Sequence, residues 1–164
     1  MSVPPFIDGV RAIADRFDGF ILDMWGVLHD GQRPYPGVVD CLTRLKAAGK
    51  RLVVLSNAPR RVAPAKARMA EIGIDPALID GMMTSGEDAW HHLRDRTDPW
   101  YARLGRACFH LGPARDKGML EGQDIDVVDT IETAAFILNT GADADDEKVE
   151  SYTPLLTRAA ARKL

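Results

Sequence analysis

Two positions along the chain carry residue types that suit phosphoryl transfer. Asp23 directly follows the apolar run Gly19–Leu22, and Ser56-Asn57 closes a second apolar run. Gly26 and Gly31 allow the chain after Asp23 to turn sharply, so that successive backbone N–H groups can point at an anion. A carboxylate can attack phosphorus while a hydroxyl and backbone amides hold the phosphoryl oxygens, and Mg²⁺ screens the repulsion between carboxylate and phosphate.

The order of apolar and amphipathic segments predicts the elements that would position these residues. Short apolar runs predict strands at 19–22, 51–55, 80–84, 107–111, 126–128 and 134–138, and amphipathic patterns predict helices at 6–17, 38–48, 62–72, 85–94 and 145–162. Pro154 predicts a kink or an interruption in the last helix. Strands that alternate with helices at this spacing predict βαβ units and a parallel sheet, and hence an α/β fold.

A parallel sheet would place its candidate site beyond the carboxyl ends of the strands. If the strands that end at Asp23 and Ser56 are neighbours, the carboxylate and the hydroxyl face one crevice. The residues alone leave a structural alternative open, because an Asp at a strand end is usually a turn or cap residue and Ser-Asn commonly begins a helix-capping turn. Spacing by itself favours that structural role.

The longer segments around Asp23 and Ser56 favour the catalytic role, because they resemble two motifs of the haloacid dehalogenase superfamily. Residues 20–31 resemble its motif I, and residues 52–60 resemble its motif II, which is hydrophobic and ends in Ser or Thr. Pro36-Gly37 and Met83-Thr84-Ser85-Gly86 resemble the class IIA branch, which is related to NagD and the nitrophenylphosphatases. The resemblance implies a Rossmann-like parallel-sheet core over residues 1–104 and the first part of an inserted C2-type α/β cap domain over residues 105–164.

This resemblance implies a Mg²⁺-dependent phosphatase that acts on a small phosphorylated metabolite, such as a sugar or nucleotide phosphate. Asp23 would be the nucleophile and a ligand of Mg²⁺, and the backbone carbonyl of Trp25 would face the metal. Ser56 would hydrogen-bond the transferring phosphoryl group, and Asn57 would lie beside the substrate. Backbone amides from Met24 to Gly26 would help to hold the phosphate.

The sequence departs from the family pattern in two places. Trp25 stands where the family's phosphatases usually carry a second Asp as general acid and base, and an indole cannot transfer a proton at neutral pH. His29 and Asp30 are the nearby alternatives as proton donors. The family also needs a Lys and an acidic pair after the cap, and the residues up to Leu164 do not supply them. The chain therefore reads as the first half to three-fifths of an enzyme.

Two other function classes stay open at this level. Trp25 and the missing motifs also fit a catalytically silent phosphate-binding or interaction module of the same fold. Asp23 as the phospho-acceptor of a response regulator is a weaker interpretation, because the acidic pair on an earlier strand is absent. Arg60 and Arg61 could meet an anionic substrate or be solvated, and His91-His92 should point to different faces of their helix, which disfavours a shared metal.

The composition excludes some partners and predicts a compartment. The formal net charge of -3 gives no electrostatic reason to expect nucleic acid or an anionic membrane. No apolar run approaches the roughly 20 residues that span a bilayer, and the N-terminal residues lack the pattern of a signal peptide. Cys41 and Cys108 suggest no disulfide framework. We expect a cytoplasmic protein that binds a small phosphorylated metabolite, and association into a homo-oligomer remains open.

Overall fold

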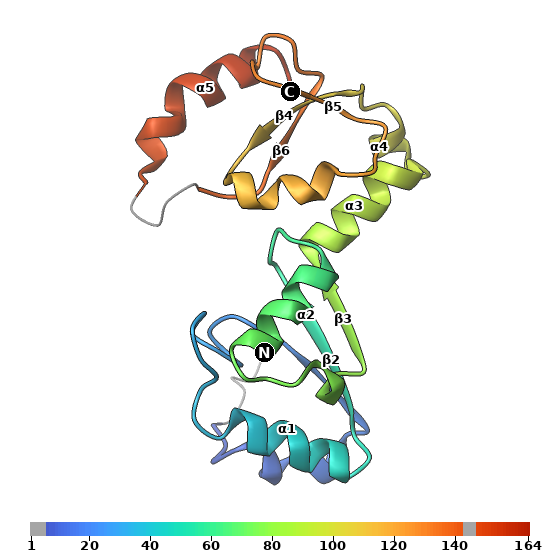
Figure 1. Ribbon diagram of the computed structural model, residues 1–164, viewed down its shortest axis with the longest axis vertical. Coiled ribbons are helices and arrows are strands. Elements are labelled where there is room, and N and C mark those ends of the chain that lie inside the picture. The colour runs from blue at the N-terminus through green and yellow to red at the C-terminus, as the bar shows by residue number, and fades with distance from the viewer. Residues whose placement is uncertain (1–5, 143–146) are drawn as a thin grey trace. The chain divides into compact units, whose positions relative to one another are not determined.

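The computed structural model describes residues 6–142 and 147–164. The chain forms two compact units, the first made of the residues up to Asn57 together with Val62–Thr84, and the second made of Ala58–Arg61 and Ser85–Leu164. Each unit has its own three-stranded parallel sheet with helices (Figure 1). The predicted α/β class is confirmed.

The first unit is built around the strands β1 (Gly19–Leu22), β2 (Arg51–Ser56) and β3 (Gly81–Thr84), in the order β1-β2-β3. The helices α1 (Val38–Ala47) and α2 (Val62–Glu71) complete it. Apolar side chains from the sheet and both helices form one core, which includes Leu52, Val54, Leu42, Leu45, Ala65 and Met69. The burial of this core fixes the register of the strands, since a slip by one residue would turn the buried side chains to the other face.

The opposite face of the same sheet is apolar and exposed. Ile21, Leu55 and Met83, one from each strand, are all exposed to solvent. They alternate along their strands with the side chains that pack on the helices, as the two-residue period of a strand requires. Sheets made of parallel strands are normally buried on both faces, so this open face is an unusual feature of the unit.

The second unit contains three further strands, in the order β5-β4-β6. The strands are β4 (Ala107–Leu111), β5 (Asp126–Val128) and β6 (Phe136–Asn139), and the helical segments are α3 (Ser85–Asp95), α4 (Pro99–Ala102), η4 (Ala114–Leu120) and α5 (Val149–Ala161). Its core joins Leu93 of α3 with Cys108, Leu120 and Phe136. The predicted boundary at residue 104 concerns the start of a cap domain and stays a prediction; in the packing, α3 and α4 group with the second sheet.

The prediction of one helix over residues 6–17 is wrong. The segment 6–17 forms two short 3₁₀ helices, η1 (Val10–Ala12) and η2 (Ala14–Arg16), rather than one amphipathic helix. No side chain caps the first of them, and the backbone of Ile13 leaves the helical region between them, so the sequence gains too little to nucleate a longer helix. Helix α5 continues through Pro154, so the predicted interruption is absent, while a kink there stays a prediction. The predicted start of this helix at 145 falls outside the described residues.

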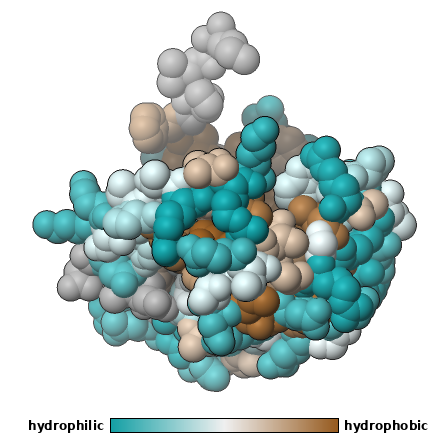
Figure 2. Space-filling model, turned by 90° about the horizontal axis from the view of Figure 1, so that it is seen from above, coloured by the Kyte–Doolittle hydropathy of each residue, from teal (hydrophilic) through white to brown (hydrophobic). Residues whose placement is uncertain are grey.

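Among the described residues, no helix is long and apolar enough to cross a membrane. On the face seen in Figure 2, hydrophilic side chains are interspersed with smaller apolar patches.

Candidate active site

The strand register brings the two sequence motifs to one edge of the first sheet. Strands β1 and β2 are parallel neighbours, with Leu22 opposite Val54. Asp23 therefore leaves β1 close to the point where Ser56 ends β2, on strands about 4.8 Å apart. The condition set by the sequence, that the two strands be neighbours, is met. The Asp23 residue is exposed, whereas Ser56 is buried and lies opposite Thr84 of β3.

The loop after Asp23 folds back on itself through backbone hydrogen bonds. The Met24 N–H donates to Asp23 Oδ1 at 2.6 Å, and the Leu28 N–H donates to the Met24 carbonyl at 2.8 Å. Gly26 adopts φ of 78°, a conformation that favours glycine, and its N–H donates to the His29 carbonyl at 2.9 Å. The Met24 and Gly26 amides therefore shape the loop in this conformation, and a bound anion would have to share them.

Buried and exposed side chains alternate around this loop. Met24 and Leu28 belong to the hydrophobic core of the first unit and tie the loop to it. Trp25 between them is 69% exposed, so its indole contributes little to the packing of that core. Trp25 therefore lies two residues from the candidate nucleophile with most of its surface available to a ligand.

An arginine on α2 anchors the far end of the loop. Arg68 donates through Nη2 to the Gly31 carbonyl at 2.7 Å and through Nη1 to Glu71 Oε2 at 2.9 Å. Gly31 also needs its glycine identity, because its φ is 93°. The contact of Arg68 could not be predicted from the sequence, because 37 residues separate it from Gly31 and no local pattern indicates such a contact.

Neither alternative proton donor is well placed for general acid chemistry. Backbone N–H groups of Arg33 and Gln32 donate to the Asp30 carboxylate and lower its pKa, so Asp30 is ionised at neutral pH. His29 is buried, and burial, with a smaller effect of Arg68, lowers its pKa. Its Nδ1 accepts the Gly31 N–H at 2.9 Å, so neutral His29 carries its proton on Nε2. A neutral imidazole is a very weak acid.

The two arginines that follow motif II have partners in the second unit. Arg61 forms an ion pair with Glu87 at 2.7 Å, and Arg60 Nε lies 3.9 Å from Asp116 Oδ1. Arg61 is therefore not simply solvated, because two of its donors bind Glu87. Contact of either arginine with an anionic substrate stays a prediction.

The adjacent histidines of α3 have separate partners, as the sequence predicts. His91 Nε2 lies 3.4 Å from Glu87, and His92 Nε2 lies 3.6 Å from Asp88. Each histidine therefore pairs with the acidic residue four positions earlier, on its own part of the helix surface.

The residues around Asp23 suit Mg²⁺ in the kind of ligand they offer. An exposed carboxylate and the Trp25 carbonyl are hard oxygen ligands, and Mg²⁺ usually binds proteins through one or two carboxylates while it keeps several waters. Within the described part of the chain, no group of three or more His, Cys, Asp or Glu side chains is gathered to hold a metal ion.

Comparison with known proteins agrees with this fold. The profile of the haloacid dehalogenase-like hydrolase family matches residues 20–126. A haloacid dehalogenase-like hydrolase from Brucella suis 1330 superposes with a TM-score of 0.82 at 29% identity, over 98% of this chain and 58% of that chain. The 4-nitrophenylphosphatase from Thermotoga maritima gives a TM-score of 0.57 at 28% identity, over 89% of this chain and 53% of that one.

A curated relative matches part of the chain at higher identity. Human chronophin is 35% identical over 88 residues, which are 53% of this chain and 30% of chronophin. The match thus spans about a third of the length of this relative. The family profile covers both candidate motifs and more than half of the chain, and the chain belongs to the haloacid dehalogenase-like hydrolases.

Proposed function

We propose that the site at the carboxyl edge of the first sheet hydrolyses phosphomonoesters of small metabolites with the help of Mg²⁺. The observation that carries the proposal is the parallel register of β1 and β2, which brings Asp23 and Ser56-Asn57 to the same edge. Similarity to a 4-nitrophenylphosphatase supports the reaction class.

In this proposal, a carboxylate oxygen of Asp23 attacks phosphorus. The bond between phosphorus and the ester oxygen breaks, and that oxygen leaves with the electron pair. Water then attacks the phosphorus of the aspartyl phosphate, which releases inorganic phosphate and regenerates the carboxylate. The Ser56 hydroxyl donates a hydrogen bond to the phosphoryl group, Asn57 lies beside the substrate, and the amides from Met24 to Gly26 support the phosphate.

A Mg²⁺ ion, held by the Asp23 carboxylate and the Trp25 carbonyl, would screen the negative charges that meet in this reaction. The chain's own residues determine a further property. Trp25 cannot give a proton, and neither His29 nor Asp30 is suited to do so, so none of these three residues would give the leaving oxygen strong general-acid help. The site should therefore prefer esters with acidic leaving groups, such as aryl phosphates, over alkyl phosphates.

The test is an assay with 4-nitrophenyl phosphate and Mg²⁺ on the chain and on Asp23→Asn. We expect the substitution to lower the rate by at least about a thousandfold, because an amide cannot replace the nucleophile. Asp30→Asn is the matched control, since an amide oxygen can still accept the two backbone hydrogen bonds that Asp30 accepts. Undiminished activity in Asp23→Asn would remove Asp23 from the role of nucleophile.

One observation favours a second function, a silent phosphate-binding module. The exposed indole of Trp25 occupies the position where a general acid would stand, and neither nearby residue replaces it. Such a module would bind inorganic phosphate in isothermal titration and would not hydrolyse 4-nitrophenyl phosphate. It would also stay inactive in Trp25→Asp, whereas an enzyme that lacks a general acid should gain activity from that change.

A further inference from the structure

The loop Ala58–Arg61, which begins one residue after Asn57, packs directly on the first turn of α3. The Gly86 N–H donates to the Ala58 carbonyl at 3.1 Å. A Cβ at Gly86 would lie 2.6 Å from the backbone N, C and O atoms of Arg60, which is closer than real Cβ atoms approach. The loop backbone at Arg60 therefore lies so close to α3 that only a glycine fits at position 86. This contact holds the middle of the loop in place.

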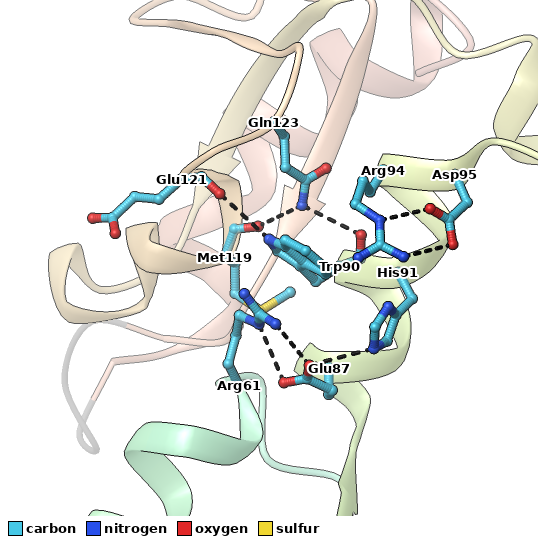
Figure 3. A network of polar contacts seen from close by, with 9 residues as sticks. All are labelled: Arg61, Glu87, Trp90, His91, Arg94, Asp95, Met119, Glu121 and Gln123. Carbon is cyan, nitrogen blue, oxygen red and sulfur yellow. Dashed lines mark hydrogen bonds and ion pairs between the residues drawn. The ribbon is translucent and has the colours of Figure 1, made fainter.

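The side chain of Arg61 adds a second attachment between the same loop and the same helix. Its Nε and Nη2 donate to the two carboxylate oxygens of Glu87 at 3.1 and 2.7 Å, a bidentate pair (Figure 3). The guanidinium carbon lies 3.6 Å from the centroid of the Trp90 ring. Because the Glu87 side chain is 13% exposed, this pair is shielded from solvent more than an ordinary surface ion pair.

The indole that Arg61 stacks on is itself held in position. Trp90 Nε1 donates to the Glu121 carbonyl at 3.3 Å, and Gln123 Nε2 donates to the Trp90 carbonyl at 3.4 Å. Arg94 also approaches the ring, at 4.6 Å from its centroid, while Asp95 neutralises it through two hydrogen bonds. Arg61 thus docks on a fixed aromatic surface, where a cation gains from the ring quadrupole.

These contacts restrict the chain on the far side of the candidate phosphate-binding residues. Ser56 is held in β2 within the first unit, Ala58 is held by Gly86 within the second unit, and Asn57 connects them along the chain. We propose that Arg61 is a positioning residue: its clamp on Glu87 and Trp90 fixes the 58–61 loop, which continues the chain directly from Asn57, and so limits the movement of Asn57. This inference rests on the proposed function for its catalytic consequence, but not for the clamp itself.

The test compares Arg61→Ala and Arg61→Lys with Arg94→Ala, a matched control that removes a cation from the same indole without contacting the loop. Hydrogen exchange of the amides from Asn57 to Val62 should accelerate by about tenfold or more in Arg61→Ala, and stay near the wild-type rate in Arg94→Ala. Arg61→Lys keeps the positive charge but loses the bidentate geometry of the guanidinium, so its exchange rates should lie between those of the two alanine variants.

Kinetics with 4-nitrophenyl phosphate provide the second readout. Since small displacements of binding groups lower catalytic rates strongly, kcat should fall about ten- to a hundredfold in Arg61→Ala, with a much smaller change in inhibition by inorganic phosphate. Weaker phosphate inhibition with unchanged loop exchange would overturn the proposal, because Arg61 would then contact the substrate itself. If the wild-type chain hydrolyses no phosphomonoester, the proposed function fails, and unchanged exchange in Arg61→Ala alone would refute the clamp.

Discussion

Two leucines of β2 test whether the first sheet is open on one face in solution. Leu52 is completely buried between the sheet and its helices, whereas Leu55, three residues along the same strand, is 54% exposed on the other face. Leu52→Ala and Leu55→Ala make the same chemical change in the same strand, so differences in backbone propensity largely cancel. What remains is the difference in burial.

The structure sets the size of the expected difference. Truncating Leu to Ala removes three carbons, each worth about 0.8 kcal/mol when fully buried, and a rigid core adds the cost of a cavity. Leu52→Ala should therefore lower the free energy of unfolding by about 3 to 5 kcal/mol. About half of the Leu55 side chain is already in water and its removal leaves no enclosed cavity, so Leu55→Ala should cost about 1 kcal/mol or less.

Urea denaturation of both variants, followed by circular dichroism, measures this difference if the m-values stay equal. A cost for Leu55→Ala within about 1 kcal/mol of that for Leu52→Ala would refute the open face and show that something covers it. Repeating the titration at several protein concentrations then identifies the cover, because association of chains raises the midpoint with concentration. Homo-oligomer formation stays a prediction until that series is measured.

Three further predictions follow from buried groups. Burial lowers the pKa of His29 from 6.5, so the unfolded chain binds more protons than the folded chain. The free energy of unfolding should therefore fall as the pH drops from about 7 to about 5. Urea titrations at several pH values should show this slope, and the slope should be smaller in His29→Gln. Burial raises the pKa of the Cys108 thiol to about 11, so peptide mass spectrometry after alkylation at pH 8 should find Cys41 labelled first. Gly86→Ala should lower the free energy of unfolding, measured with urea, by about 1 to 3 kcal/mol. Gly118→Ala is the control: a Cβ there would meet no described atom within 4 Å, so the change should be less than about 1 kcal/mol.

The strands and the edge that carries the site could be predicted from the sequence because their signals are local. The run Arg51–Ser56 is apolar, β-branched in its centre and flanked by turn residues, and it forms β2. Asp23 and Ser56 each end such a run, so a parallel sheet is enough to bring them to one edge. The sequence does not show that β1 and β2 are neighbours in the sheet; the observed pairing does.

The remaining features depend on residues that are distant in sequence. Arg68 binds the Gly31 carbonyl across 37 positions, and Arg61 pairs with Glu87 across 26. A periodic pattern in the sequence does not indicate which basic side chain will contact a given loop in the folded protein. The failed prediction over residues 6–17 has a different cause: an apolar period of 3.6 is present, but no side chain caps either short helix and the backbone of Ile13 leaves the helical region.

Two of these distant contacts hold the loops that follow the candidate site residues in the chain. The loop after Asp23 is closed by its own backbone and anchored by Arg68 of α2, within the first unit. The loop after Asn57 is attached to α3 through Arg61, within the second unit. The candidate nucleophile and the candidate phosphate-binding residues are thus each followed by a loop that an arginine holds through contacts with protein. In the proposed reaction, Mg²⁺ and backbone amides would help to neutralise a bound phosphate.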